Sequence, residues 1–534
     1  MKSSSVIKWA VIIGSLAITC GARAQSLWDL ANQNKETLRI AALFPAQDVR
    51  DRLSSDKGID EAIDWCKKTG VTHAFIESFR DGYTAERKAL EHARDRFRAA
   101  GFDVSGCVTT TKVGKDSTGW KSIACYTDEP TQKHIQEIFE YAASMFDEIM
   151  IDDFWFTDCQ CDQCKTARGD KSWTDYRCDL MTRLSRERIL APAHNENKKV
   201  QIIVKFPQWY DLHHERGYEV VRETAEFDRI WVGTETRDPD NDRWGKKCQY
   251  EAYYIMRWLG GIGGAKCGGG WFDPYGTHEA AYVEQARQTV LADAKEMLLF
   301  CYGSLLRDTG PANVEKLRTE IPGLFKLAGL VRGRPLKGIA APKPPNSDGL
   351  DEQYIYDFVG MLGLPLVPTA EVRTDVKAAF LPVHALKDQQ LSDKLATMLK
   401  AGTPVLVTDG LARKLPAAMA EDKNLLVLKV NGKPGTLLDL TREQLRPIRD
   451  KLLAPLGIGF DAPNKVALYL FGDHCLAVEN VTDEAITAAL EFAQPIQASK
   501  ALVLPDNGAA EFTCRAGKID FAKITPRTLV VLTY

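Results

Sequence analysis

The chain has 534 residues, of which 45% are hydrophobic and 26% charged, and its formal net charge is −3 at pH 7. This near balance of charges gives no sign of a basic surface for nucleic acid or for an anionic membrane. The length exceeds what one hydrophobic core can hold, so several domains are expected.

The first 24 residues have the layout of a secretory signal peptide. Lys2 and Lys8 precede an apolar stretch, and Ala22-Arg23-Ala24 resembles a cleavage site before Gln25. We therefore expect residues 1–24 to be removed and the mature protein to be secreted or periplasmic. No later apolar run is long enough to span a bilayer, so no membrane span is expected.

From Thr37 to about Arg334, short apolar strands alternate with amphipathic helices. Eight strands are expected, at Leu38–Phe44, Val71–Phe79, Asp103–Thr110, Glu148–Phe154, Val200–Phe206, Arg229–Glu235, Gly264–Phe272 and Glu296–Tyr302. Eight such units predict a (β/α)₈ TIM barrel over residues 25–334. The alternative is a doubly wound open sheet, which more often has a glycine-rich turn after its first strand than Phe44-Pro45-Ala46-Gln47-Asp48.

The pattern changes after the barrel. Residues 335–423 alternate strands and helices over a short length and predict a small α/β domain. Residues 424–534, beginning with Leu425–Lys429, contain mostly short strands separated by turns and predict a C-terminal β-sandwich. Neither segment carries clustered ionisable groups, so we expect support, oligomerisation or glycan contact there, and a homo-oligomer stays open.

Several ionisable and aromatic residues fall at the predicted carboxyl ends of barrel strands, where such folds carry their chemistry. The ionisable residues are Glu77, Asp152, Asp153, Lys205, Glu235 and Asp273, and the aromatic ones include Trp155, Phe156, Trp209, Trp271, Tyr275 and Tyr302. One carboxyl group can protonate a departing glycosidic oxygen while another attacks or activates water, and aromatic rings pack against sugars. The pattern therefore predicts a secreted glycoside hydrolase that cleaves an oligo- or polysaccharide.

For this enzyme the candidate roles divide into two groups. The catalytic candidates are Asp152, Asp153, Glu235 and Asp273. The substrate-binding candidates are Glu77, Lys205, Trp209, Trp271 and Tyr302. No cofactor is expected for catalysis. By contrast, Asp147 and Asp228 precede strands and belong to the bottom of the barrel, where polar residues serve stability.

Each candidate also has a structural interpretation. The Asp-Asp pair could cap a helix or pair with basic residues, and Glu235 could pair with Arg237. Asp273 precedes Pro274 and could be a turn residue, and Trp209 could fill a strand–helix interface. For the whole protein, the alternative is a non-catalytic glycan-binding barrel that keeps the aromatic surface without a working carboxyl pair.

Three cysteines, Cys159, Cys161 and Cys164, lie close together after the Asp-Asp pair. A structural zinc site needs four ligands, and Cys107 or Cys125 could supply the fourth. Disulfide pairing is the competing interpretation in an exported protein. Redox chemistry at Cys161-Asp162-Gln163-Cys164 lacks a thioredoxin-like context.

This layout resembles the glycoside hydrolase family 42 β-galactosidases, which have a catalytic barrel, an amidotransferase-like α/β domain and a small β domain. In that family a Cys-x-Cys-x-x-Cys run follows the acid/base residue after the fourth strand, and an upstream cysteine completes a zinc site. Cys159, Cys161 and Cys164 match this run, which implies the same zinc site here.

The resemblance has two departures. The family has Asn-Glu where this chain has Asp152-Asp153, and it has a glutamate nucleophile after the seventh strand where this chain has Asp273. The fourth-strand aspartate also looks like that of α-galactosidase-type barrels, which place an aspartate nucleophile there and a carboxylic acid after the sixth strand. Under that resemblance Glu235 is the acid.

Overall fold

A computed structural model describes residues 25–241, 247–496 and 500–534. The predicted signal peptide, residues 1–24, lies outside the described residues. The chain forms two compact units, one of Ser26–Gly245 with Ile255–Ile321 and one that includes Lys246–Tyr254 and Pro322–Tyr534. In the part of the chain that is described, no helix combines the length and the apolar character needed to cross a membrane.

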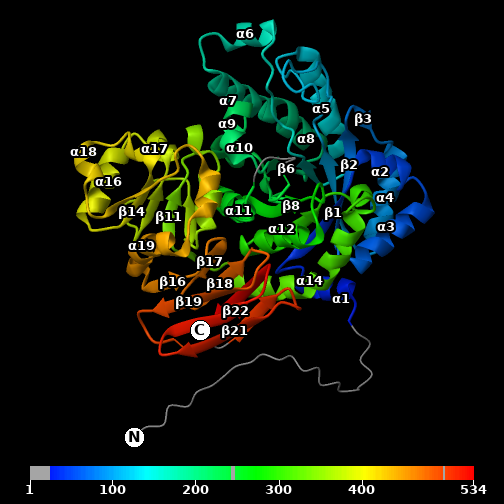
Figure 1. The fold of residues 1–534 in the computed structure, drawn as a ribbon. Helices are drawn as coiled ribbons and strands as arrows, with labels where there is room; N and C mark the ends of the chain where they lie inside the picture. The colour runs from blue at the N-terminus through cyan, green and yellow to red at the C-terminus, as the bar shows by residue number, and fades with distance from the viewer. Residues whose placement is uncertain (1–24, 242–246, 497–499) are drawn as a thin grey trace, which may run out of the picture. The chain divides into compact units, whose positions relative to one another are not determined.

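Eight parallel strands form the centre of the first unit, with helices around them (Figure 1). They are β1 (Arg39–Phe44), β2 (His73–Arg80), β4 (Asp103–Val108), β5 (Glu148–Ile151), β6 (Gln201–Phe206), β7 (Arg229–Gly233), β8 (Cys267–Phe272) and β9 (Glu296–Leu299). Each strand pairs with the next in this order, and β9 pairs with β1 to close the sheet. A short strand, β3 (Tyr83–Thr84), pairs antiparallel with β2. The predicted TIM barrel is therefore confirmed.

Helices surround the strands of this unit (Figure 1). Their bounds are α1 (Leu27–Asn34), α2 (Ala46–Asp51), α3 (Asp56–Lys68), α4 (Arg87–Ala99), α5 (Glu129–Ala143), α6 (Asp162–Arg168), α7 (Trp173–Leu184), α8 (Ala191–Glu196), α9 (His213–Arg216), α10 (Val220–Glu226), α12 (Glu279–Leu291) and α13 (Tyr302–Leu305). Two longer helices, α11 (Tyr250–Gly263) and α14 (Gly310–Val331), contribute residues to both units. In α4 the buried residues are Leu90, Ala93 and Phe97, which follow the helical repeat of the sequence.

The inside of the barrel is filled by apolar side chains. They are Ala41, Leu43, Phe75, Cys107, Met150, Ile203, Trp231, Trp271, Leu298, Phe300 and Cys301. Trp231 and Trp271 are the largest of them, and the neighbouring strand β8 makes room for the Trp231 ring with glycine. A Cβ atom on Gly268 would lie 2.5 Å from Trp231 Nε1, and one on Gly269 would lie 3.0 Å from the same ring. The glycine run therefore serves the packing of the barrel.

The second unit contains a five-stranded parallel sheet. Its order is β12 (Leu366–Thr369), β11 (Ile339–Pro342), β13 (Ala379–Leu381), β14 (Val405–Thr408) and β15 (Leu425–Leu428), and its helices are α15 (Ile355–Gly360), α16 (Leu391–Lys400), α17 (Asp409–Ala412) and α18 (Ala417–Ala420). The sequence pattern assigned the strand at Leu425 to the antiparallel segment, but β15 pairs in parallel with β14. A four-residue apolar run does not reveal its pairing partner.

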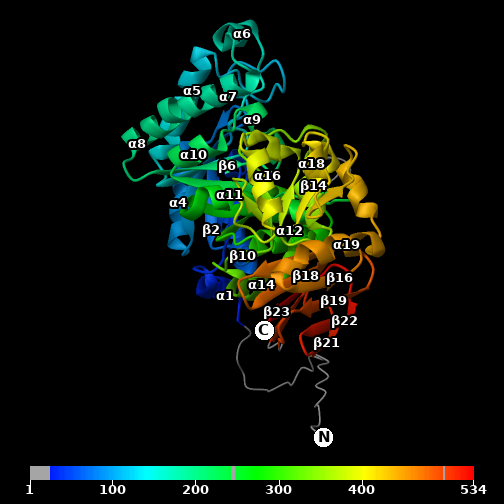
Figure 2. The ribbon, with the colours of Figure 1, turned by 90° about the vertical axis from the view of Figure 1, so that its left-hand side faces the viewer.

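Antiparallel strands form the predicted β-sandwich, and those that follow α19 (Arg442–Leu453) are coloured orange to red in Figure 2. One sheet has the order β10 (Leu336–Lys337), β17 (Val466–Phe471), β18 (Cys475–Asn480), β23 (Thr528–Thr533) and β20 (Lys500–Leu504). The other has the order β16 (Ile458–Asp461), β19 (Ile486–Phe492), β22 (Lys518–Ile524) and β21 (Ala510–Arg515). The fold class predicted from the sequence is therefore confirmed.

Candidate active site

A layer of polar side chains lies above the apolar core, at the carboxyl ends of the strands. Side chains alternate along a strand, so a residue two positions after a core residue also points into the barrel. Glu77, Thr109, Asp152 and Lys205 follow the core residues Phe75, Cys107, Met150 and Ile203 in this way, and all four are buried. The period of the strands thus brings acidic and basic groups together in a protected place.

Arg80 joins two of the predicted acidic residues. Its Nε donates to Glu77 Oε2 and its Nη2 to Asp152 Oδ2, both at 2.7 Å. The Thr109 hydroxyl donates to the same two carboxylates, at 2.5 Å and 3.1 Å, and the Asp153 backbone N–H donates to Asp152 Oδ1 at 2.7 Å. Because their oxygens are occupied by these hydrogen bonds, Glu77 and Asp152 hold Arg80, Thr109 and the Asp153 backbone in place.

Lys205 lies between two further carboxylates. Its Nζ is 2.5 Å from Glu235 Oε1 and 3.3 Å from Asp153 Oδ2, so these two oxygens lie no more than 5.8 Å apart, the sum of the two distances. The same ammonium lies 4.0 Å above the centre of the Trp271 ring. Burial acts to lower the pKa of Lys205, but Asp153 and Glu235 outweigh it and the pKa is raised. The group therefore remains an ammonium.

The glycine at the end of β7 lets Glu235 reach this position. Gly233 follows the core residue Trp231 by two positions, so a side chain there would point into the barrel. A Cβ atom on Gly233 would collide with Glu235 Oε2. Only 2% of Glu235 is exposed, and Oε2 has no hydrogen-bond partner within the described residues. Glu235 therefore contributes a carboxylate with one free oxygen.

The two adjacent aspartates differ in their electrostatics. Burial raises the pKa of Asp153, and the nearby charges of Asp152 and Glu235 raise it further, against Lys205. For Asp152 burial also acts to raise the pKa, but Arg80 and Lys205 hold it below its usual range. The side chain of Asp153 keeps 16% of its surface exposed, whereas Asp152 keeps 2%. Of the two, Asp153 is the one suited to carry a proton to a ligand.

Asp273 forms an ion pair with Arg237, the residue that the sequence suggested as a partner of Glu235. Arg237, which could have paired with Glu235, instead forks onto Asp273, with Nη2 at 2.7 Å from Oδ2 and Nε at 3.0 Å from Oδ1. Asp273 Oδ1 also accepts from the Tyr275 backbone N–H at 3.1 Å. Its carboxylate is thus engaged in an ion pair and a turn.

The predicted aromatic residues occupy different environments. Trp271 is buried beneath Lys205, and Trp209 is half-buried with its ring 5.3 Å from that of Phe156. Tyr302 differs from the prediction, because β9 ends at Leu299 and Tyr302 begins α13. Its ring packs against Trp65 of α3 at 5.3 Å and against Phe44 of β1 at 4.9 Å. Tyr302 therefore contributes to strand–helix packing.

Four cysteines come together in the loops after β4 and β5. They are Cys125, Cys159, Cys161 and Cys164, and their sulfur atoms all lie within 4.8 Å of one another. Cys107 lies in the barrel core, so the structure selects Cys125 from the two proposed fourth ligands. Three of the sulfur pairs are 3.5 to 3.7 Å apart. A tetrahedral zinc ion with four thiolates places its sulfurs about 3.8 Å apart, so the residues fit the metal.

The thiolate form that zinc requires is favoured at one of these residues. Burial acts to raise the pKa of Cys159, but hydrogen bonds from backbone N–H groups outweigh it and lower the pKa to about 6. No disulfide joins any of the twelve cysteines among the described residues. In both views α6, which follows this loop, lies at the top of the barrel unit (Figure 1, Figure 2).

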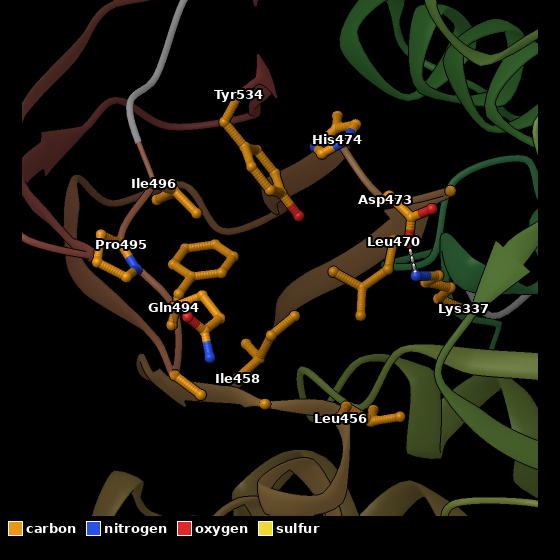
Figure 3. Close-up of a pocket in the computed structure, with 14 residues that line it drawn as sticks. Lys337, Leu456, Ile458, Leu470, Asp473, His474, Gln494, Pro495, Ile496 and Tyr534 are labelled. Atoms are coloured by element: carbon orange, nitrogen blue, oxygen red, sulfur yellow. Dashed lines mark hydrogen bonds and ion pairs between the residues drawn. The ribbon is translucent and has the colours of Figure 1, made fainter.

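A separate cavity of about 710 Å³ lies in the β-sandwich (Figure 3). Its lining includes Tyr534, Phe492 and several aliphatic residues, and the carboxylate in its lining, Asp473, is paired with Lys337. One paired carboxylate cannot serve as both acid and nucleophile. The chemistry therefore belongs to the mouth of the barrel.

Residues 25–337, more than half of the chain, match the family described as "Probable glycosyl hydrolase, catalytic domain". The chain belongs to this family. It is a glycoside hydrolase, and the matched residues contain the barrel and every carboxylate described at its mouth. A carbohydrate is therefore its substrate.

Similar proteins agree with this family at the level of the fold. An uncharacterised protein of Saccharolobus solfataricus is 24% identical over 429 residues, which cover 72% of this chain and 68% of that protein. An α-L-fucosidase from Paenibacillus thiaminolyticus has a TM-score of 0.64 at 10% identity and covers 93% of this chain and 99% of its own. A GH42 β-galactosidase from G. stearothermophilus has a TM-score of 0.61 at 10% identity, with 93% and 98% covered. The resemblance to the family 42 fold is confirmed.

Several residues of this glycosyl hydrolase were missed in the sequence. Arg80 and Thr109 hydrogen-bond to both Glu77 and Asp152. Trp120, Phe154 and Asp158 lie in the loops after β4 and β5. Arg80 had a signal, since it directly follows the predicted strand Val71–Phe79 that contains Glu77. Trp120 had none, because it lies in a long loop without a periodic pattern.

Proposed function

We propose that this glycosyl hydrolase cleaves an oligo- or polysaccharide with retention of anomeric configuration, using Asp153 and Glu235 as its catalytic pair. The observation that supports the pair is the ammonium of Lys205, which binds one oxygen of each and limits their separation to 5.8 Å. Carboxyl groups about 5 to 5.5 Å apart are typical of retaining enzymes, and about 6.5 to 9.5 Å of inverting ones. An oxygen-to-oxygen distance of at most 5.8 Å between Asp153 and Glu235 therefore favours retention.

The roles follow from the surroundings of the two groups. Asp153 has a raised pKa and an exposed edge, so it is the general acid. Glu235 is ion-paired with Lys205 and has a free oxygen, so it is the nucleophile. This assignment is the reverse of the one implied by α-galactosidase-type barrels, and the experiment below separates the two.

In the first step Glu235 forms a bond to the anomeric carbon while the glycosidic carbon–oxygen bond breaks, and Asp153 gives its proton to the departing oxygen. In the second step Asp153 takes a proton from water, the water oxygen bonds to the anomeric carbon, and the bond to Glu235 breaks. Asp152 keeps Asp153 in place by accepting its backbone N–H at 2.7 Å, and Arg80 in turn holds Asp152 at 2.7 Å. Both carboxyl groups finish as they began.

The test uses variants that remove one carboxyl group at a time. Wild-type protein is assayed with 4-nitrophenyl glycosides of common sugars in both anomeric forms, and the first product is identified by NMR. Asp153→Gly and Glu235→Gly are then assayed with sodium azide and the substrate that the wild type cleaves. If Asp153 is the acid, its variant forms a glycosyl azide of the same anomeric configuration as the substrate, whereas the Glu235 variant forms the opposite one.

The reverse pattern of azide products would exchange the two roles, and an inverted wild-type product would exclude retention. Each single variant should also lose at least about 10²-fold in kcat/KM, the lower end of the effect of a general acid. Because Asp153 must be protonated and its pKa is raised, kcat/KM should fall as the pH rises through that pKa.

We also propose that Cys125, Cys159, Cys161 and Cys164 hold a structural zinc ion that joins the loops after β4 and β5. When bound, zinc would supply a cross-link between the loops and no catalytic step. Metal analysis should find about one zinc per chain, and Cys161→Ser should lower this value. The matched control is Cys514→Ser, which changes a free cysteine of the sandwich. Absence of zinc with paired oxidation of the loop thiols would contradict the site.

Export of the protein is a further proposal, and it rests on the signal-peptide layout of residues 1–24. N-terminal sequencing of protein recovered outside the cytoplasm should begin at Gln25. A first residue of Met1 in that material would contradict cleavage.

A further inference from the structure

We propose that Trp120, together with Phe154, forms the binding subsite for the sugar on the leaving-group side of the cleaved bond. The preferred substrate is then a saccharide with at least one sugar ring beyond that bond, and not a glycoside of a small alcohol. This inference rests on the proposed function, because it takes Asp153 as the general acid.

Trp120 is unusual in its exposure among the tryptophans that the structure describes. It keeps 47% of its surface exposed, whereas Trp155, Trp231, Trp258 and Trp271 are almost fully buried. An isolated exposed apolar residue needs no explanation on its own. The surroundings of Trp120, however, show that the chain holds this ring in one place.

The loop that carries Trp120 is folded back on itself. The Ser117 N–H donates to the Ile123 carbonyl at 2.8 Å, and the Cys125 N–H donates to the Lys115 carbonyl at 2.7 Å. At the tip, the Ile123 N–H donates to the Trp120 carbonyl at 2.9 Å. Residues 112–125 therefore form a hairpin-like loop after β4, with Trp120 in its turn.

Asp158, from the loop after β5, fixes the tip of this hairpin. Its Oδ2 accepts from the Trp120 backbone N–H at 3.0 Å and from Arg216 at 2.8 Å, and the Ser117 hydroxyl donates to Oδ1. Gly119 allows this approach, because a Cβ atom there would collide with the Asp158 carboxylate. A carboxylate with three donors thus joins Trp120 to the loop that begins at Asp153.

The ring of Trp120 continues an aromatic surface that starts beside the proposed acid. Its centre lies 5.4 Å from that of Phe154, the residue directly after Asp153, and 6.4 Å from that of Phe156, nearly parallel to it at 25°. Flat aromatic faces of this kind pack against the apolar faces of sugar rings. The surface therefore offers a platform for a pyranose next to the acid.

The position of the acid decides which sugar this is. A general acid protonates the oxygen that links the cleaved sugar to the leaving group, so it must lie beside that oxygen. The leaving-group ring is the next ring beyond this oxygen. A platform that begins one residue after Asp153 and extends outward to an exposed tip is placed to meet that ring.

The cysteine cluster lies at the base of the same two loops. Cys125 closes the hairpin, while Cys159 follows Asp158 directly in the chain. The Thr118 hydroxyl of the hairpin donates to Cys159 Sγ at 3.9 Å and accepts from the Gln160 N–H at 2.7 Å. The proposed zinc ion would therefore brace the loop of Trp120 against the loop of Asp153.

The test compares two substrates that share the cleaved sugar. One is the disaccharide or oligosaccharide of the sugar and anomer that the wild type cleaves, and the other is the corresponding glycosyl fluoride, whose leaving group contains no sugar. Trp120→Ala should lower kcat/KM for the saccharide by at least about tenfold, chiefly through KM, and change the value for the fluoride by less than about twofold. Trp120→Phe should recover part of the loss, because it keeps an aromatic face.

The matched control is Trp28→Ala, which removes a partly exposed tryptophan of α1 that packs on Phe102. It should leave the ratio of the two kcat/KM values unchanged. An equal loss on both substrates, or no loss on the saccharide, would overturn the subsite while fluoride hydrolysis by the wild type still supports the proposed function. Failure of the wild type to hydrolyse either substrate would contradict both proposals.

Discussion

The two ends of the barrel use buried charges in opposite ways. At the bottom, Glu296 of β9 lies between two partners, Arg39 of the neighbouring β1 at 2.5 Å and His73 of β2, one strand further on, at 2.7 Å. The other ring nitrogen of His73, Nε2, forms a hydrogen bond with the Ser105 hydroxyl at 2.8 Å. At the mouth, one ammonium, Lys205, faces three carboxylates, and Glu235 keeps an oxygen without a partner among the described residues.

The pKa values follow this difference. Burial acts to raise the pKa of Glu296, but His73 and Arg39 outweigh it and lower the pKa to about 2. At the mouth, burial and like charges raise the pKa of Asp153. A network whose charges are matched stabilises the fold, whereas one with an excess of carboxylates keeps a proton available for chemistry. Glu296 is buried and Asp153 is mostly so, and their different charged partners give them different roles.

Of the variants that test this difference between the two ends of the barrel, removal of Lys205 should have the largest effect on activity and stability. Lys205→Met leaves Asp152, Asp153 and Glu235 without their shared cation, and we expect a loss of about 10²- to 10³-fold in kcat/KM. Stability at neutral pH should also fall by about 3 to 5 kcal/mol, because buried carboxylates are left uncompensated. Kinetics and denaturant unfolding at several pH values measure both effects.

The pH dependence checks the cause of that loss. Without Lys205 the carboxylates should have raised pKa values in the folded state, so their stability contribution is present below the unfolded pKa and is lost as the pH rises. The deficit of the variant should therefore be smallest in acid and grow toward neutral pH. A deficit independent of pH would point to lost packing on Trp271 instead.

At the bottom of the barrel, Glu296→Gln should lower stability without changing the chemistry. The difference between the ordinary pKa of 4.5 and the folded value of about 2 corresponds to about 3 kcal/mol. Because the folded pKa is depressed, this contribution is complete above about pH 4.5 and is lost as the pH falls toward 2. Denaturation from pH 7 to pH 2 should show that dependence in the wild type and a weaker one in the variant.

The same variant separates the two ends of the barrel. Its kcat at neutral pH should remain within about twofold of the wild-type value where both are folded. A large loss of kcat in a folded Glu296→Gln protein would contradict the division between a stabilising bottom and a catalytic mouth.

The smallest effect is expected at Asp228, a second bottom-face carboxylate. Its Oδ2 accepts from the Ile202 backbone N–H at 2.8 Å and contacts His194 at 3.1 Å, and the side chain is 31% exposed. Asp228→Asn keeps an acceptor there, so thermal unfolding should show a loss of no more than about 1 kcal/mol, with unchanged activity. Loss of turnover would show that this residue does more than anchor β6.

Sequence reasoning succeeded where local periodicity carries the information. The predicted strand ends placed Asp152 and Lys205 at the mouth, because the carboxyl ends of the parallel strands of a barrel all lie at the same face. The spacing of Cys159, Cys161 and Cys164 likewise indicated a cluster. The strand at Leu425 could not be assigned in this way, because its short apolar run was compatible both with the parallel sheet, to which it belongs, and with the antiparallel sandwich.

The amino-acid sequence by itself determined the barrel, the acidic layer at its mouth and the three-cysteine run, because these depend on periods of two and 3.6 residues and on short spacings. Only the tertiary structure decided that Cys125 and not Cys107 joins the cluster, that Arg237 pairs with Asp273, and that Tyr302 packs against Trp65. Such pairings depend on the paths of long loops between strands. No local pattern encodes those paths, since they are set by packing between residues far apart in the chain.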